Sequence, residues 1–274
     1  VGSLAEGMKV FDRYTLMKIV GRGRFSVVWQ AWDERLNRDT ALKFLPDMVK
    51  PDASALATLK SELRQIQEIK HPQIIPIDNV EQEGPLVAIS TDFINGATLA
   101  SLREQKSDQV FSPAELADWM QQLFTVLEFS HREALRPHGT LKPSNILVDQ
   151  KGTLRLADYG LEQQVLQFVS RTSGLTDVGP DLRYMSPQQA VGEPDTVLDD
   201  IYAVGVTLYE LLTSKPPFYT GDIMLQSQQK IPPPMTHRRK ELRVIGQPVT
   251  RIWEETVAAC LSKDPGQRPQ GIPQ

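Results

Sequence analysis

Short apolar runs separated by polar turns dominate the first ninety residues of the chain, a pattern typical of β-strands. The runs cover residues 14–20, 27–32, 40–45, 74–80 and 86–91. Glycine and polar residues separate the first three runs, so neighbouring strands can reverse direction over short turns. The pattern therefore predicts an antiparallel sheet built mainly from strands adjacent in sequence.

One stretch within this region has helical spacing. Over residues 54–69, Leu59, Glu62, Leu63 and Ile66 stand at positions i, i+3, i+4 and i+7, which places them on one face of a helix. A carboxylate buried among leucines needs a cation to offset its desolvation. We therefore expect Glu62 to meet a basic residue of the same lobe.

The hydrophobic period changes after Asn95 and Gly96, which break the strand pattern. From there on apolar residues recur mainly at the spacing of amphipathic helices. The elements predicted in this region are helices over 116–127, 201–211 and 250–261 and two short strands at 146–149 and 154–157.

This order of elements predicts an α+β fold with two lobes that form one domain. We expect a small antiparallel β lobe with one helix over residues 1–94, in which residues 1–12 form a tail. A larger α-helical lobe would cover residues 95–274. The length of 274 residues is sufficient for a substantial core.

Composition and charge exclude several classes of protein. The chain carries 30 Lys and Arg against 34 Asp and Glu, a formal net charge of −4, so no global basic excess indicates nucleic-acid binding. The longest apolar stretch, 201–209, is far shorter than the roughly 20 residues that a membrane span needs. The basic run at 237–240 is expected to lie in a solvated loop.

The single cysteine, Cys260, cannot form an internal disulfide, and neither metal-binding spacing nor a secretory leader is seen. We therefore expect a cytoplasmic location. The first residues are Val-Gly-Ser rather than methionine, which predicts a fragment of something longer, such as the cytoplasmic domain of a larger protein.

Two features of the β lobe could serve a phosphate-containing ligand. Gly21-Arg22-Gly23-Arg24-Phe25-Ser26 lies between two predicted strands, and glycines let backbone amides approach phosphate oxygens. The alternative is an ordinary glycine hairpin turn. Lys43 follows on a strand with apolar neighbours. A single strand lysine is usually solvated, but Lys43 and Glu62 could satisfy each other.

The most informative segment is His138-Gly139-Thr140-Leu141-Lys142-Pro143-Ser144-Asn145, followed by Leu156-Ala157-Asp158-Tyr159-Gly160. Through these motifs the chain resembles the protein kinase family, specifically the bacterial Ser/Thr kinases of eukaryotic type. The resemblance extends over nearly the whole chain, and its further motifs are Tyr184-Met185-Ser186-Pro187-Gln188, Asp199-Asp200-Ile201-Tyr202, Pro216-Pro217-Phe218, Asp264-Pro265 and Arg268-Pro269.

The resemblance implies a site for ATP and Mg²⁺. Lys43 would contact the α- and β-phosphates and pair with Glu62, while Asn145 and Asp158 would hold Mg²⁺. The third glycine of the family loop is Ser26 here, a small residue that should still let the loop cover phosphates. The other implied ligand positions are Gly21 and Gly23 in this loop, Val28, Ala41 and Leu147 around adenine, Thr91 as gatekeeper, and Asp92, Phe93 and Ile94 in the hinge.

Three departures from the family pattern concern the protein substrate. Thr140 stands where the family has the aspartate that accepts the substrate hydroxyl proton, and a threonine hydroxyl is no proton acceptor at neutral pH. Gly139 replaces the arginine that would bind a phosphate on the activation loop. Gln188 replaces the glutamate that pairs with the arginine matched by Arg268. The nucleotide side is therefore expected to be intact and the substrate side impaired.

These observations predict a pseudokinase that binds ATP and signals by conformation or by docking an unidentified protein partner. Two alternatives stay open. The first is a weakly active Ser/Thr kinase, since general-base catalysis contributes only about 10²- to 10⁴-fold. The second is an interaction module that never binds nucleotide, against which the retained Lys43, Glu62, Asn145 and Asp158 speak.

Asp181 is a carboxylate that could be related to the replacement of the family aspartate by Thr140. Aligned on Tyr184, it occupies the place of a family threonine that bonds to the catalytic aspartate and to the catalytic-loop lysine, which is Lys142 here. Thr140 and Asp181 thus resemble a swapped pair. Asp181 would accept hydrogen bonds from the Thr140 hydroxyl and the Lys142 ammonium, and could act as a displaced base. The alternative is a solvated loop carboxylate.

Overall fold

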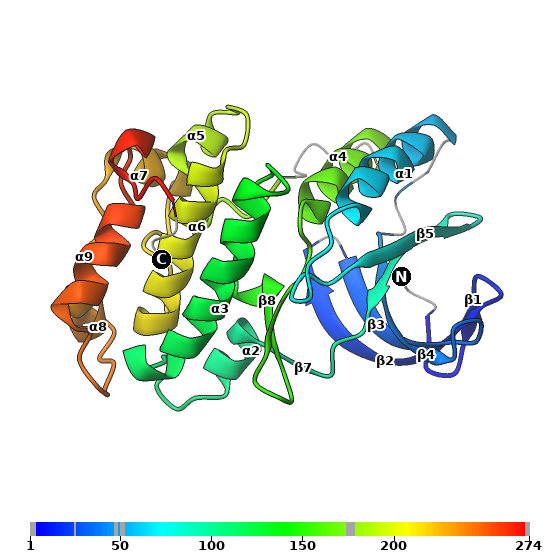
Figure 1. The fold of residues 1–274 in the computed structure, drawn as a ribbon, viewed down its shortest axis with the longest axis horizontal. Coiled ribbons are helices and arrows are strands. Elements are labelled where there is room, and N and C mark those ends of the chain that lie inside the picture. Colours follow the sequence, from blue (N-terminus) through cyan, green and yellow to red (C-terminus); the bar gives the residue numbers. More distant parts are fainter. Residues whose placement is uncertain (1–3, 25, 47–48, 50–52, 174–178, 272–274) are drawn as a thin grey trace. The chain divides into compact units, whose positions relative to one another are not determined.

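The computed structural model describes residues 4–24, 26–46, 49, 53–173 and 179–271. The chain forms two compact units, one comprising Val1–Asn95 with Leu161–Gly179 and the other Gly96–Gly160 with Pro180–Gln274. The first is built on a β-sheet and the second is mainly helical (Figure 1). This is the α+β fold that the sequence predicted.

Six antiparallel strands in the order β1-β2-β3-β4-β6-β5 form the sheet of the first unit. The sequence pattern indicated a strand from residue 74, but β5 begins only at Ile77. Pro76 directly precedes it and has no N–H to pair in a ladder. The strands are β1 (Lys9–Val10), β2 (Tyr14–Gly23), β3 (Ser26–Asp33), β4 (Arg38–Phe44), β5 (Ile77–Glu83) and β6 (Leu86–Asp92).

The two faces of this sheet differ in exposure. Along β4, Leu42 and Phe44 are fully buried, while Ala41 and Lys43, on the opposite face, are half-buried. The buried face packs into the core of the unit together with other apolar side chains, among them Tyr14. The face that carries Lys43, called the Lys43 face below, therefore remains partly accessible.

Two helices complete the first unit, α1 (Ala53–Gln67) and α4 (Leu161–Ser173), and they lie side by side (Figure 1). The sequence predicted α1 but not α4. Leu161, Val165 and Phe168 are buried at helical spacing along α4, so the pattern for this helix was present in the sequence. By its contacts α4 belongs to the unit that contains the β-sheet.

The second unit is organised around α6 (Val197–Thr213), in which every residue from Asp199 to Thr213 is buried. The long helix α3 (Pro113–Arg132) begins at a capping box formed by Ser112 and Glu115. None of the helices in the described ranges is both long and apolar enough to cross a membrane. The other elements are β7 (Gly96–Thr98), α2 (Leu99–Glu104), η1 (Pro143–Asn145), β8 (Ile146–Asp149), β9 (Leu154–Leu156), α5 (Pro187–Ala190), α7 (Ile223–Gln229), α8 (Met235–Glu241), α9 (Arg251–Cys260) and η2 (Pro265–Gln267).

The prediction of a solvated loop at the basic run 237–240 is wrong. These residues form part of α8, and Arg238 and Arg239 are buried, with exposed fractions of 8% and 7%. Their guanidinium groups donate to backbone carbonyls, as in the 2.7 Å bond from Arg239 Nη1 to Leu212 O. Because these bonds satisfy the buried charges, the two arginines act as structural links rather than as a basic surface.

Candidate active site

The described residues of the glycine-rich segment include Gly21 and Gly23 at the end of β2 and Ser26 at the start of β3. Gly21 lies opposite Val28, and Gly23 lies opposite Ser26. A Cβ on Gly23 would lie 3.0 Å from the Ser26 hydroxyl oxygen, closer than most such contacts allow. The glycine thus permits the two strands to approach closely where Ser26 stands in place of a third glycine.

Val28, Ala41, Lys43 and Thr91 share the Lys43 face of the sheet. Val28 is directly opposite Lys43, and Ala41 is directly opposite Thr91. Opposed residues, and residues two apart on one strand, point to the same side of a sheet. All four side chains are half-buried. The structure therefore brings together the sheet positions that the resemblance assigns to adenine and phosphates.

Glu62 lies on the side of α1 that meets α4. It lines a small crevice together with Gln164, Gln167 and Phe168 of α4. No ion pair joins Lys43 to Glu62 in the described part of the chain. The expected pair is therefore not formed in this structure, where α4 covers the Glu62 side of α1.

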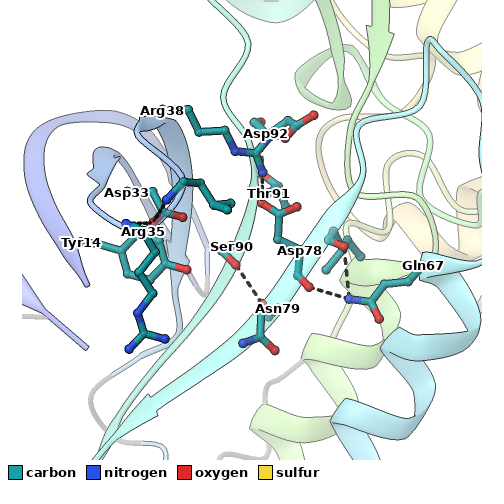
Figure 2. A network of polar contacts seen from close by, with 12 residues as sticks. Tyr14, Asp33, Arg35, Arg38, Gln67, Asp78, Asn79, Ser90, Thr91 and Asp92 are labelled. Carbon is teal, nitrogen blue, oxygen red and sulfur yellow. Dashed lines mark hydrogen bonds and ion pairs between the residues drawn. The ribbon is translucent and has the colours of Figure 1, made fainter. Parts of the chain in front are cut away.

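The hinge segment begins at Asp92, the last residue of β6. Its carboxylate accepts a hydrogen bond from Arg38 Nη1 at 2.5 Å, and its amide donates to Pro76 O at 3.4 Å. Phe93 and Ile94 follow and are half-buried. The start of the hinge is thus bonded to two other parts of the first unit, one of which is shown in Figure 2.

In the second unit, Asp200 of α6 holds the backbone of the loop that contains Thr140. The fully buried Asp200 carboxylate accepts bonds from the amides of His138 at 2.7 Å and Gly139 at 2.9 Å. Its Oδ2 also lies 2.7 Å from His131 Nε2. Carboxylate bonds to backbone amides are among the stronger hydrogen bonds in proteins, so Asp200 fixes the start of the loop.

Gly139 adopts a left-handed conformation with φ of +82°. A Cβ at this position would lie 3.1 Å from Asp195 Oδ2. The Gln189 side chain links the two residues, since its Nε2 donates to Gly139 O and to Asp195 Oδ1, both at 3.1 Å. The loop therefore has a glycine where any other residue would be strained.

Thr140 offers a hydroxyl and no carboxylate to this loop. Its Oγ1 is buried without a hydrogen-bond partner among the described residues. Its backbone is held at both ends, because its amide donates to His138 Nδ1 at 3.3 Å and its carbonyl accepts from Asn145 Nδ2 at 2.9 Å. The position is well defined, but it carries no proton acceptor at neutral pH.

Asn145 and Asp158 fit a role as Mg²⁺ ligands. Asn145 is 4% exposed, and its Nδ2 is committed to Thr140 O, which orients the amide group. Asp158 has a left-handed φ of +58°, unusual for a residue other than glycine. An amide oxygen and a carboxylate are both ligand types that Mg²⁺ accepts. The metal would supply charge neutralisation at nucleotide phosphates.

Leu147, the remaining adenine position, lies on β8 of the second unit. It is opposite Thr98 of β7 and Arg155 of β9 and is half-buried. Neighbouring residues of the strand, Ile146 and Val148, are buried. The alternation leaves the Leu147 side chain on the less buried face of the small sheet.

The predicted bonds from Thr140 and Lys142 to Asp181 are not formed. The Asp181 carboxylate instead accepts bonds from Arg183, at 2.8 Å from Nε and 2.6 Å from Nη2. Burial raises the pKa of Asp181, but the bonds and charge of Arg183, with a smaller effect from the charge of Lys142, bring that pKa below its usual value. A bidentate arginine explains the outcome, because its geometry matches a carboxylate better than a hydroxyl does.

Gln188 bonds to Arg268, so a hydrogen bond from a charged to a neutral group stands where the family has an ion pair. Arg268 is 2% exposed, and its Nη2 donates to Gln188 Oε1 at 2.5 Å. The Lys263 ammonium is buried nearby over the Phe218 ring, 4.9 Å from its centroid, without a hydrogen-bond partner among the described residues. Burial, with a smaller effect from the charge of Arg268, lowers the pKa of Lys263 to about 8. Arg268 Nη1 also lies 3.6 Å from Asp199 Oδ1, whereas the neutral Gln188 adds no negative charge beside the two cations.

Sequence reasoning assigned no role in the site to Asp200, His131 or Arg38. Asp200 lies in a motif that carries the resemblance, and the residues around His131 in the sequence indicate no role for it. The two residues meet only because α6 passes the end of α3, which spacing along the chain does not reveal. Arg38 lies in a polar stretch between strands and gave no signal of its own.

Known proteins of one family match this chain over most of its length. The protein kinase domain family matches residues 14–272. Serine/threonine-protein kinase PknB of Mycolicibacterium smegmatis is 30% identical over 267 residues, covering 94% of this chain and 41% of that protein. A "Probable serine/threonine-protein kinase PknB" of Lactococcus lactis is 34% identical over 262 residues, covering 93% of this chain and 40% of that protein. The chain thus spans about two fifths of the length of these relatives.

Solved structures share the fold at lower identity. The Mycobacterium tuberculosis PknI kinase domain has a TM-score of 0.72 at 19% identity, covering 98% of this chain and 95% of that chain. The PpkA-294 apo form has a TM-score of 0.76 at 21% identity, covering 99% and 97%. The chain belongs to the protein kinase domain family and is related to the bacterial Ser/Thr kinases of eukaryotic type.

Proposed function

We propose that this chain is an ATP-binding protein kinase domain in which phosphoryl transfer to protein hydroxyls is impaired. It would act by conformation or by docking a protein partner. ATP and Mg²⁺ are its proposed ligands, and the cytoplasm is its proposed location.

The observation that carries the proposal is the threonine at position 140. In kinases a loop aspartate accepts the substrate hydroxyl proton, and the Thr140 hydroxyl cannot do so at neutral pH. Asp181, the candidate for a displaced base, is bonded to Arg183, which holds its pKa below the usual value. A carboxylate with a lowered pKa is a weaker proton acceptor, so it compensates poorly for Thr140.

Retained residues support nucleotide binding. The Lys43 face presents one cation beside small apolar side chains at Val28 and Ala41. The base of a nucleotide would need the apolar side chains, and its phosphates would need the cation. The glycine turn would offer backbone amides to phosphate oxygens. Asn145 and Asp158 would hold Mg²⁺ and thereby orient the phosphates.

The packing of α4 on α1 also supports impaired transfer. In kinases the pair between the strand lysine and the helix glutamate must be in place for transfer. In this chain Glu62 lines a crevice with α4 rather than pairing with Lys43. Movement of α4 away from α1 would be a means of signalling by conformation.

A second candidate function is slow Ser/Thr kinase activity. It is favoured by the retained phosphate and metal residues and by the activity named for the relatives. Loss of a general base reduces a rate by about 10²- to 10⁴-fold. Transfer at such a reduced rate would be slow yet measurable.

Calorimetric titration with ATP, with and without Mg²⁺, tests the proposal. We expect saturable binding that Mg²⁺ strengthens in the wild type. Asp158→Asn should remove the effect of Mg²⁺ while leaving metal-free binding similar, since it deletes one charged ligand. Absence of ATP binding at millimolar nucleotide would refute the proposal and favour an interaction module that does not use nucleotide.

A further inference from the structure

Arg38, the first residue of β4, bridges two carboxylates in the first unit (Figure 2). Its Nη1 lies 2.5 Å from Asp92 Oδ1, and its Nη2 lies 2.7 Å from Asp78 Oδ2. The three side chains are between 24% and 39% exposed. The planar fork of a guanidinium suits such a double contact, whereas the point charge of a lysine does not.

The bridge joins the hinge to the strand that follows α1. Asp92 ends β6 and starts the hinge, while Asp78 lies at the beginning of β5. The backbone carbonyl of Asp78 accepts a 2.8 Å bond from the side chain of Gln67, the last residue of α1. Arg38 therefore fixes the first hinge residue to a part of the sheet that is itself anchored.

Without the Arg38 guanidinium, the two carboxylates would face each other uncompensated. Burial raises the pKa of Asp78, and the charge of Asp92 raises it further, while Arg38 has the opposite effect. Removal of the cation therefore leaves two like charges that repel. The end of β6 is the part that can move, because residues 93–95 after Asp92 belong to no strand.

We propose that Arg38 is a positioning residue that holds the hinge segment Asp92–Ile94 in the geometry required to bind the base of the nucleotide. This inference rests on the proposed nucleotide binding. Hinge recognition of a base uses directional hydrogen bonds, which weaken steeply when donor and acceptor are misaligned. Arg38 thus affects the base portion of the ligand and not its phosphates.

Arg13 provides a matched control within the same sheet. It also bridges two carboxylates, with its Nη2 2.6 Å from Asp33 and its Nη1 3.3 Å from Glu81. Arg13 precedes β2 and has no bond to the hinge among the described contacts. Its side chain is more buried than that of Arg38, so Arg13→Ala should destabilise the fold at least as much as Arg38→Ala.

The test compares the dissociation constants of ATP, adenosine and inorganic tripolyphosphate for the wild type, Arg38→Ala and Arg13→Ala. Circular dichroism and urea unfolding establish that each variant is folded at the assay temperature. For Arg38→Ala we expect ATP and adenosine to bind about tenfold more weakly, by the same factor, with tripolyphosphate unchanged. That factor corresponds to about 1.4 kcal/mol. Arg13→Ala should change none of the three constants.

A rescue variant separates repulsion from loss of packing. In the Arg38→Ala background, Asp78→Asn removes one of the two facing charges and should restore part of the adenosine affinity. The inference would be overturned if Arg38→Ala weakened the binding of all three ligands equally, or if Arg38→Ala bound adenosine no more weakly than Arg13→Ala does. In either case, ATP binding by the wild type would leave the proposed function standing. If the wild type itself binds neither ATP nor adenosine, both the inference and the proposed function fail.

Discussion

The Lys43 face of the first unit and the loop around Thr140 in the second unit differ in how much of the family pattern they keep. The Lys43 face keeps its residue types at Val28, Ala41 and Lys43 and their positions on one side of the sheet. The loop keeps its backbone, which Asp200 holds by two amide bonds, but it has lost the side chain that would accept a proton. The comparison teaches that a loop can retain its architecture after its chemistry has changed.

The largest effect is expected from Asp200→Ala, which tests whether the loop architecture depends on one carboxylate. The change leaves the buried amides of His138 and Gly139 without acceptors, and each unsatisfied group costs about 1–3 kcal/mol. We expect the free energy of unfolding, measured in urea, to fall by about 3–5 kcal/mol. Asp195→Ala is the control, since the half-buried Asp195 carboxylate accepts a bond only from Gln189 among its described contacts. A loss for Asp200→Ala no larger than for Asp195→Ala would contradict the assigned role of Asp200.

The next largest effect concerns the Lys43 face. If ATP binds only the folded state, a concentration of 100 times the dissociation constant should raise the free energy of unfolding by about 2.7 kcal/mol. Lys43→Met should remove most of this gain, because it deletes the cation that would contact the phosphates under the proposed function. Lys9→Met, at a strand lysine bonded to Glu34 in the same sheet, should leave the gain intact. An equal loss in both variants would show that Lys43 has no special role.

The sequence predicted the sheet and the main helices well where one period ran over many residues, as in β3 and α6. It missed α4, although the buried positions Leu161, Val165 and Phe168 are at helical spacing along that segment. The contact between α4 and α1 joins segments about a hundred residues apart, and no local pattern encodes such a contact. Glu62 lies at that same long-range contact, where it lines a crevice with residues of α4.

The sequence alone could predict which residues belong to the site, but not all the contacts that they make. Positions such as Lys43 and Asn145 could be named from motifs, and the face that Lys43 occupies on β4 agrees with strand alternation. The partner of Asp181 could not be predicted, because both Lys142 and Arg183 were available and only the folded loop selects Arg183. Arg38 could not be identified, since its two carboxylates lie 40 and 54 residues away in sequence.

A smaller effect on stability is expected from substitution of Gly139, which has no side chain and adopts a left-handed backbone conformation. Gly139→Ala should cost about 1–2 kcal/mol, because an L-residue is disfavoured at φ of +82° and its Cβ would crowd Asp195. Gly152→Ala is the matched control, with φ of +81° and open space around the added atom. Urea unfolding of both variants should show the larger loss at Gly139. Equal losses would mean that the Asp195 contact has no energetic weight.

The smallest expected effect is a pH dependence from Lys263. Its pKa falls to about 8 in the folded state, against about 10.4 when unfolded. Between these values the unfolded state binds more protons, so stability should rise as pH increases from about 8 to about 10. Lys263→Met should remove this contribution, which the difference between the two unfolding curves would show. Gln188→Glu places a carboxylate beside the two cations and should reduce the rise, because it raises the pKa of Lys263. A wild-type curve that matches that of Lys263→Met across this range would contradict the buried-lysine assignment.

Single-turnover transfer of labelled phosphate from ATP to protein hydroxyls tests the central claim most directly, when it is measured at an ATP concentration that saturates binding. We expect saturable ATP binding together with transfer far below the roughly 1–100 s⁻¹ typical of protein kinases. Thr140→Asp alone should restore little of this rate, because Gly139 and Gln188 remain unchanged. Transfer by the wild type within the kinase range, abolished by Asp158→Asn, would contradict the account and establish an active kinase.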